Sequence, residues 1–208
     1  MTDSLIVIQT IIIIFLLIVI YHAEKTENMV TSPVDGRAYE VIEHMNDKHL
    51  AADKLAQINE WNLKFIKYLC EKPKKSMEYI LGKRLSNNYD PNVLFENNPT
   101  DKHNTSYTED KGRTLALCLR EKETGNHNIH ETNLIMFVNI HELSHIASLD
   151  FGHDHDMDFW PNFKVLLHAA EKMGGYIPVD YGKNTQNYCG LDINYNPYHD
   201  VHLRDAEP

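Results

Sequence analysis

The sequence predicts one α+β domain that is preceded by a single N-terminal transmembrane helix. Its 208 residues are enough for one ordinary domain, and an apolar content of 42% is enough for a hydrophobic core. Helical hydrophobic periodicity recurs along the chain, and short apolar runs of strand length lie between the periodic segments. We therefore expect a membrane anchor at residues 1–21, a tether at residues 22–35 and the α+β domain at residues 36–208.

The expected anchor is an almost uninterrupted apolar run. Residues 5–21 read LIVIQTIIIIFLLIVIY, in which only Gln9 and Thr10 are polar. As a helix this run would span about 25 Å, just enough to cross a bilayer. A cleaved signal peptide is disfavoured because no Lys or Arg precedes the run and no small-residue cleavage pattern follows it. The sequence thus predicts an uncleaved anchor that makes the membrane a partner through residues 5–21.

The side of the membrane is only weakly indicated. Lys25 and Arg37 follow the apolar run among acidic residues, and this bias favours a cytosolic domain. Cys70, Cys118 and Cys189 lie far apart, which is typical neither of a disulfide framework nor of thiolate zinc ligands. We therefore expect three unpaired cysteines in a reducing environment.

The charge balance argues against one class of partner. The chain has 30 acidic and 20 basic residues, with a formal net charge of −10. Such a chain lacks the electrostatic footprint of a protein that binds phosphate backbones. Nucleic acid is therefore not expected as a partner.

Hydrophobic periodicity predicts the elements of the domain in order. A helix is expected at residues 47–71, followed by a segment at 72–111 that is mostly loop with a short helix near 77–85. Residues 114–120 form an apolar run of strand length.

The second half of the domain contains two predicted helices. Residues 131–149 are apolar on most helical faces, as in a central buried helix, and residues 158–173 form an amphipathic helix that Gly174 and Gly175 end. Short extended segments are expected at 176–181 and 188–193.

The motif that indicates chemistry is HELSH, which lies in the predicted central helix. His141 and His145 are four residues apart, so on a helix their imidazoles project from one face toward one point. Two neutral imidazoles and one further ligand suit Zn²⁺, with a fourth position left for water. Glu142 can reach that water and act as general base. The alternative is a pair of core histidines that are satisfied by hydrogen bonds alone.

The residues themselves leave two candidates for the third ligand. The metzincin pattern requires Gly and His where Ser148 and Phe151 stand, so that pattern is excluded. Gly152 can end the helix, and the acidic loop behind it offers His153 and His155 as candidate ligands.

This arrangement resembles the SprT-like and WLM-type zinc metallopeptidases, which are small gluzincin-like, HExxH proteins. The resemblance covers residues 134–173 and includes a histidine four residues before the aromatic residue that begins the next helix, as His155 precedes Phe159. It implies a zincin-like fold with a central HExxH helix and a small sheet, and cleavage of peptide bonds in a protein or peptide substrate. It also implies that His141, His145 and His155 are zinc ligands and that Glu142 is the catalytic base.

The sequence also departs from that group. It has no cysteine-rich zinc ribbon and no basic extension, so cleavage of DNA–protein crosslinks is not expected. A thermolysin-like alternative would use Glu171 as the third ligand. Tyr181 and Tyr188 are candidates for a hydroxyl that stabilises an oxyanion.

These observations together predict a membrane-anchored zinc metalloendopeptidase. Two alternatives stay open: a membrane-tethered scaffolding protein that retains a zinc-binding fold without catalysis, and a non-proteolytic metal hydrolase on the same fold.

Overall fold

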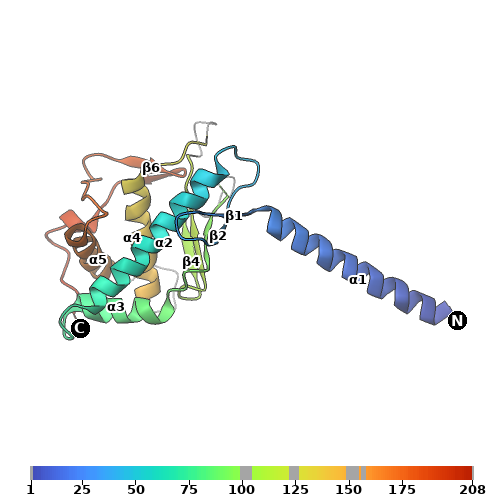
Figure 1. The fold of residues 1–208 in the computed structure, drawn as a ribbon. Coiled ribbons are helices and arrows are strands. Elements are labelled where there is room, and N and C mark those ends of the chain that lie inside the picture. Colours follow the sequence, from blue (N-terminus) through green and yellow to red (C-terminus); the bar gives the residue numbers. More distant parts are fainter. Residues whose placement is uncertain (1, 99–104, 122–126, 149–154, 156–157, 208) are drawn as a thin grey trace.

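The computed structural model describes residues 2–98, 105–121, 127–148, 155 and 158–207. The helices of its domain lie together on one side of a small mixed sheet, and two β-hairpins complete the domain (Figure 1). In chain order the elements are α1 (Thr2–Glu27), β1 (Met29–Thr31), β2 (Ala38–Glu40), α2 (Lys48–Cys70), α3 (Met77–Asn88), β3 (Leu94–Glu96), β4 (Tyr107–Glu109), β5 (Thr114–Leu117), α4 (Thr132–Ala147), α5 (Phe159–Met173), β6 (Gln186–Tyr188), β7 (Leu191–Ile193) and a 3₁₀ turn (Pro197–His199).

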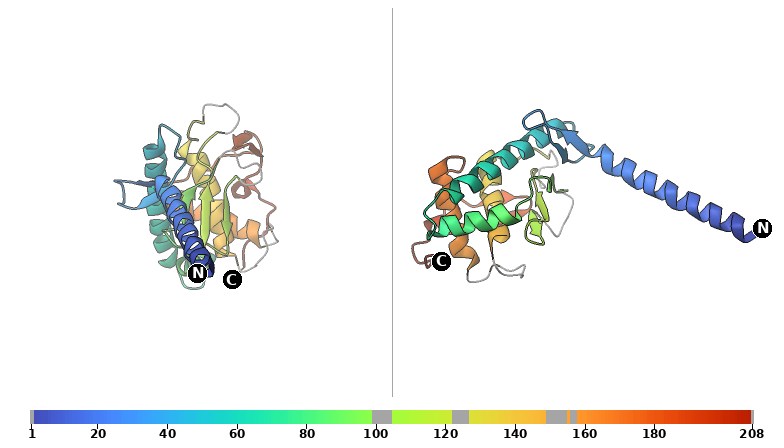
Figure 2. Two further views of the ribbon diagram at one scale, coloured as in Figure 1. Left: turned by 90° about the vertical axis from the view of Figure 1, so that its right-hand side faces the viewer. Right: turned by 60° about the horizontal axis from the view of Figure 1, so that its bottom comes forward.

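The N-terminal apolar run lies in α1, which projects away from the domain in Figure 1 and in the right-hand view of Figure 2. Within the part of the chain that the structure describes, no helix combines the length and apolar character that a bilayer span requires. The predicted N-terminal transmembrane helix and the single-pass membrane localisation are therefore wrong. Without a membrane anchor, the charges that follow the apolar run no longer indicate a cytosolic side for the domain.

The three-stranded sheet has the order β3-β5-β4, which places β4 at an edge. β3 runs parallel to β5 and β4 runs antiparallel to it. β5 confirms the strand predicted from the apolar run at 114–120, and its leucines are fully buried. β3 and β4 lie in a segment that was expected to be mostly loop, because three-residue strands are too short to show an alternating pattern.

The helix predictions are confirmed with shifts of one or two residues at most boundaries. α2, α4 and α5 occupy the three long periodic segments, and α3 occupies the short one after Ser76, whose hydroxyl caps its first turn. Residues 176–181, which were expected to be extended, form no strand with another described segment. The second extended prediction, 188–193, overlaps the β6–β7 hairpin.

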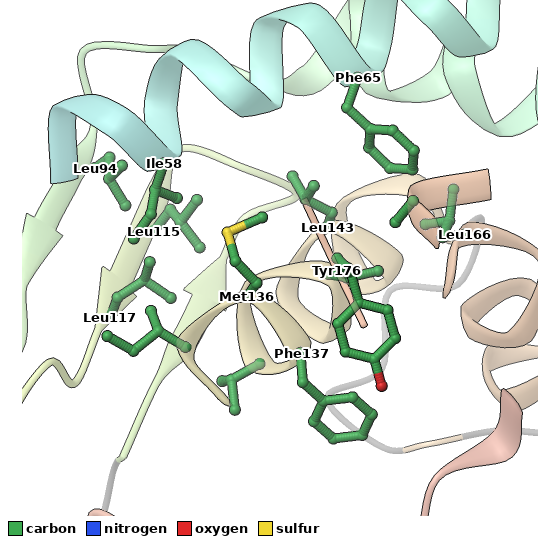
Figure 3. Close-up of a cluster of buried hydrophobic side chains, with 14 of the residues drawn as sticks. Ile58, Phe65, Leu94, Leu115, Leu117, Met136, Phe137, Leu143, Leu166 and Tyr176 are labelled. Atoms are coloured by element: carbon green, nitrogen blue, oxygen red, sulfur yellow. The ribbon is translucent and has the colours of Figure 1, made fainter. Parts of the chain in front are cut away.

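α4 is the central element of the core. Figure 3 shows Met136, Phe137 and Leu143 projecting from it among side chains of the sheet, of α2 and of the C-terminal segments. Because α4 is covered on most faces, a polar side chain on it must be paired or must face a cleft.

α2 and α3 approach each other closely at Gly82. A Cβ atom at this position would lie 2.6 Å from the Cβ of Leu69 and 3.0 Å from the backbone nitrogen of Cys70. Only glycine, which has no side chain, lets α2 and α3 approach this closely.

Buried amides connect α2 to α4. Asn62 and Asn139 exchange side-chain hydrogen bonds, with Nδ2 to Oδ1 distances of 3.1 and 2.7 Å. Asn62 also donates to the Tyr89 hydroxyl, which donates to Asn59 at 2.6 Å. This network satisfies the polar groups that the helices bury.

The same network continues to the β1–β2 hairpin. Asn59 donates to the Tyr39 hydroxyl, which in turn donates to Asp35 at 2.6 Å. Burial alone would raise the pKa of Asp35, but hydrogen bonds from Tyr39 and Arg37 outweigh burial and lower this pKa below its ordinary value.

A disulfide between Cys118 and Cys189 joins the end of β5 to the turn of the β6–β7 hairpin. Its Cα atoms are 6.4 Å apart although the two cysteines are separated by 71 residues in sequence. The expectation of three unpaired cysteines is therefore wrong, because distance along the chain does not report proximity in the fold. Cys70 is the free cysteine of the described chain.

Candidate metal centre

The three predicted histidine ligands converge on one point. His141 and His145 project from successive turns of α4, and their Nε2 atoms are 3.2 Å apart. His155, just ahead of α5, places its Nε2 3.0 Å from that of His141. Ligand atoms at 2.0–2.1 Å from a tetrahedral zinc ion would be separated by about 3.3 Å. The cluster could therefore hold a metal ion.

Aromatic side chains at the start of α5 hold the imidazoles in place. The Phe159 ring lies between 4.4 and 4.9 Å from all three histidine rings, measured between centroids. Trp160 lies 5.1 Å from His155. α5 thus supports the third ligand through side chains four and five residues further along the chain.

The electrostatics of the cluster favour neutral imidazoles. Burial, followed by the neighbouring His145 and His155, holds the pKa of His141 well below its ordinary value. A neutral imidazole has the lone pair that a metal ion requires.

Glu142 is the buried carboxyl group beside the cluster. Its side chain accepts a hydrogen bond from the backbone N–H of Thr108 on β4. Burial raises the pKa of Glu142 to about 8, although the Thr108 hydrogen bond opposes this rise. An acid with this pKa can accept and release a proton near neutral pH.

A cleft of about 740 Å³ opens over these residues. Its lining comes from α4, from β4 and the residues around it, from the start of α5, and from β7 and the residues after it. The residues that line it outside the histidine cluster and Glu142 are Thr105–Lys111, Phe137, Val138, Ser148, Phe159, Trp160, Phe163, Tyr188 and Leu191–Tyr195.

Comparison with known proteins relates this chain to proteins of large DNA viruses. It is 31% identical over 198 residues to uncharacterized protein R325 of Acanthamoeba polyphaga mimivirus, and the match covers 93% of this chain and 98% of the relative. The chain belongs to the family of that mimivirus protein.

Two shorter matches extend this family. Uncharacterized protein 136R of Invertebrate iridescent virus 6 is 34% identical over 85 residues, covering 40% of this chain and 44% of the relative. Uncharacterized protein 042R of Invertebrate iridescent virus 3 is 32% identical over 98 residues, covering 47% and 57%. No family model matches the chain, and no solved structure does. The resemblance to SprT-like and WLM-type peptidases stays a prediction.

The structure bears differently on the two alternative third ligands, His153 and Glu171. His153 lies outside the described residues. Glu171 is exposed on α5, where its carboxylate accepts a hydrogen bond of 2.6 Å from the Tyr198 hydroxyl, and it does not line the cleft. The structure therefore does not bring Glu171 to the cluster.

The predicted oxyanion tyrosines are also placed by the structure. Tyr181 is buried against Phe137 and does not line the cleft. Tyr188 reaches the cleft, but its hydroxyl donates to the backbone carbonyl of Cys118 at 2.6 Å. Tyr195, which lines the cleft beside Trp160, was missed because no local sequence pattern marks it.

Proposed function

We propose that this protein is a zinc-dependent metallopeptidase in which Glu142 acts as general base. The observation that supports this most directly is the three-imidazole cluster, in which Nε2 of His141 lies 3.2 and 3.0 Å from those of His145 and His155, beside a buried carboxyl group. A ligand set of three histidines is typical of catalytic zinc, which keeps one position open for the reaction.

Bound zinc would supply Lewis-acid chemistry, polarising the scissile carbonyl and activating water. Glu142 lies beside the first ligand on the side that faces β4, where Thr108 holds its carboxyl group. From there Glu142 takes a proton from the attacking water and passes it to the leaving amine. Glu142 is only 4% exposed, so little bulk water reaches its carboxyl group during this transfer.

A polypeptide substrate is supported by the position of β4. In the described sheet β4 pairs with β5 along one edge, and the residues of β4 line the cleft. An extended peptide in the cleft can lie along such an edge strand, independent of its sequence. Because the Thr108 N–H is bonded to Glu142, backbone hydrogen bonds to the peptide would come from other groups of this edge segment.

The first experiment tests catalysis. The zinc-loaded full-length chain is incubated with an unfolded protein, and Glu142→Gln is compared with the wild type. We expect roughly a 10²- to 10⁴-fold loss of cleavage with zinc content unchanged, because the amide cannot accept the proton. Glu171→Gln, an exposed carboxyl group outside the cleft, is the matched control and should cleave normally. Equal cleavage by Glu142→Gln, or cleavage that a chelator leaves unaffected, would contradict the proposal.

The second experiment tests the ligands. His155→Ala should lose bound zinc in elemental analysis of the dialysed protein, whereas His199→Ala, which is exposed on the 3₁₀ turn, should retain it. Retained zinc without any turnover in the wild type would favour the alternative of a structural metal site.

A further inference from the structure

The strand β7 and the two residues after it present apolar side chains to the cleft. Leu191, Ile193 and Tyr195, called here the β7 strip, occupy alternate positions. All three line the cleft, as do Asp192 and Asn194 between them. Leu191 is 58% exposed and Tyr195 is 37% exposed. Apolar side chains gathered on the wall of a cleft are typical of a surface that binds a ligand.

The strip lies in the apolar part of a cleft that is divided by the metal cluster. Along α4, Phe137 and Val138 precede His141 by one turn, whereas Ser148 follows His145 by about one turn. β4 runs alongside in the same direction, because Thr108 contacts Glu142 and Lys111 donates to the Ser148 carbonyl. The α4 side of the cleft is therefore apolar before the histidines and polar beyond them.

Two contacts place the strip in the apolar part. The β6–β7 hairpin is attached beside the start of β4, where the Tyr188 hydroxyl lies 2.7 Å from that of Ser106. At its other end the Tyr195 ring packs edge-on against Trp160, with 5.1 Å between ring centroids, and Trp160 lies against His155. The strip thus extends from the apolar end of the cleft to the third ligand.

The strip belongs to a rigid wall. The disulfide of Cys189 attaches the hairpin turn to the end of β5, and the Cys189 N–H donates to Nε2 of His130. The Tyr188 hydroxyl adds a buried hydrogen bond to the Cys118 carbonyl. A wall that is fixed before binding loses little conformational entropy when it contacts a ligand, so it can discriminate between side chains.

We infer that the β7 strip selects polypeptide substrates that carry a bulky apolar side chain within two residues of the cleaved bond. The inference rests on the proposed peptidase function. Its occupant is an aliphatic or aromatic side chain of an extended substrate, which buries its surface against Leu191 and Ile193 beside the metal cluster. Small or charged side chains at this position gain nothing from the strip.

The test compares the wild type with Leu191→Ser/Ile193→Ser. Both proteins digest a denatured substrate, and mass spectrometry maps the cleaved bonds. We expect the wild type to favour bulky apolar residues near the bond, and the double variant to lose about tenfold of this preference with zinc content unchanged. Ile177→Ser, which removes an apolar side chain that is 72% exposed and lies outside the cleft, should cleave as the wild type does. Leu191→Ser alone provides a milder variant at an exposed position, and it should lose part of the preference.

Identical cleavage profiles for the wild type and the double variant would overturn the inference while leaving the peptidase proposal intact. Absence of cleavage by the wild type is a different result, because it refutes the proposed function. In that event, the inference is tested by measuring the affinities of labelled Leu- and Gly-containing peptides for the wild type and the double variant. Equal affinities for the two peptides in the wild type would overturn the inference as well.

Discussion

Reduction of the disulfide should destabilise the protein strongly. The bond between Cys118 and Cys189 closes a loop with a sequence separation of 71 residues. Reduction releases this constraint on the unfolded chain, and the gain in loop entropy should lower the free energy of unfolding by about 4.4 kcal/mol at 25 °C. For a domain of this size, that loss should lower the Tm by roughly 9 to 18 °C.

The assay is differential scanning calorimetry of the full chain with and without a phosphine reductant, supported by thiol titration under denaturing conditions. The oxidised protein should show one reactive thiol, that of Cys70, and the reduced protein should show all three. Cys70→Ser is the matched control, since it removes a thiol and keeps the disulfide. A Tm shift below about 2 °C, or three reactive thiols before reduction, would refute the reasoning.

Three further predictions concern stability. Asn62→Ala should lower the free energy of unfolding by about 2 kcal/mol in urea denaturation, because Asn139 is left buried without its amide partner, and the two single changes should be strongly non-additive in a double-mutant cycle. Gly82→Ala should lower the Tm, since its Cβ would lie 2.6 Å from that of Leu69; an unchanged Tm would show that α2 and α3 can separate without cost. Asp35→Asn should flatten the loss of stability in acid. Because the pKa of Asp35 is lowered in the folded state, its carboxylate stabilises the fold above the ordinary value of 3.8, and this contribution is lost as the pH falls through the folded-state pKa. If urea denaturation shows the same loss of unfolding free energy in acid for the wild type and for Asp35→Asn, the assignment is contradicted.

The residues that local geometry controls were predictable from the sequence. The spacing of His141 and His145 is that of one helical turn, so their convergence needs only that α4 be a helix. Repeated apolar positions predicted α2 and α5 for the same reason. His155 was selected by resemblance to SprT-like and WLM-type peptidases, in which a histidine lies four residues before the aromatic residue that begins the next helix, as His155 precedes Phe159. The structure brings His155 to the cluster.

The residues that complete the cleft were not predictable in this way. β4 and β7 have three residues each, and their positions depend on strand pairs and on a disulfide between distant segments. No pattern near Thr108 indicates that its N–H meets Glu142, and none near Tyr195 indicates that its ring supports Trp160. The N-terminal run shows the opposite error, since hydropathy alone predicted a membrane span that the described helices do not provide.

The sequence by itself determined the helices, the two histidines that one helix presents, and the position of the proposed general base between them. These depend on contacts within about one turn of a helix, which the backbone repeats wherever it is helical. Only the tertiary structure decided which strand holds the Glu142 carboxyl group, which cysteines are bonded and which wall of the cleft is apolar. Those features arise from contacts between residues that are far apart in the chain, and they exist because the core brings the segments together.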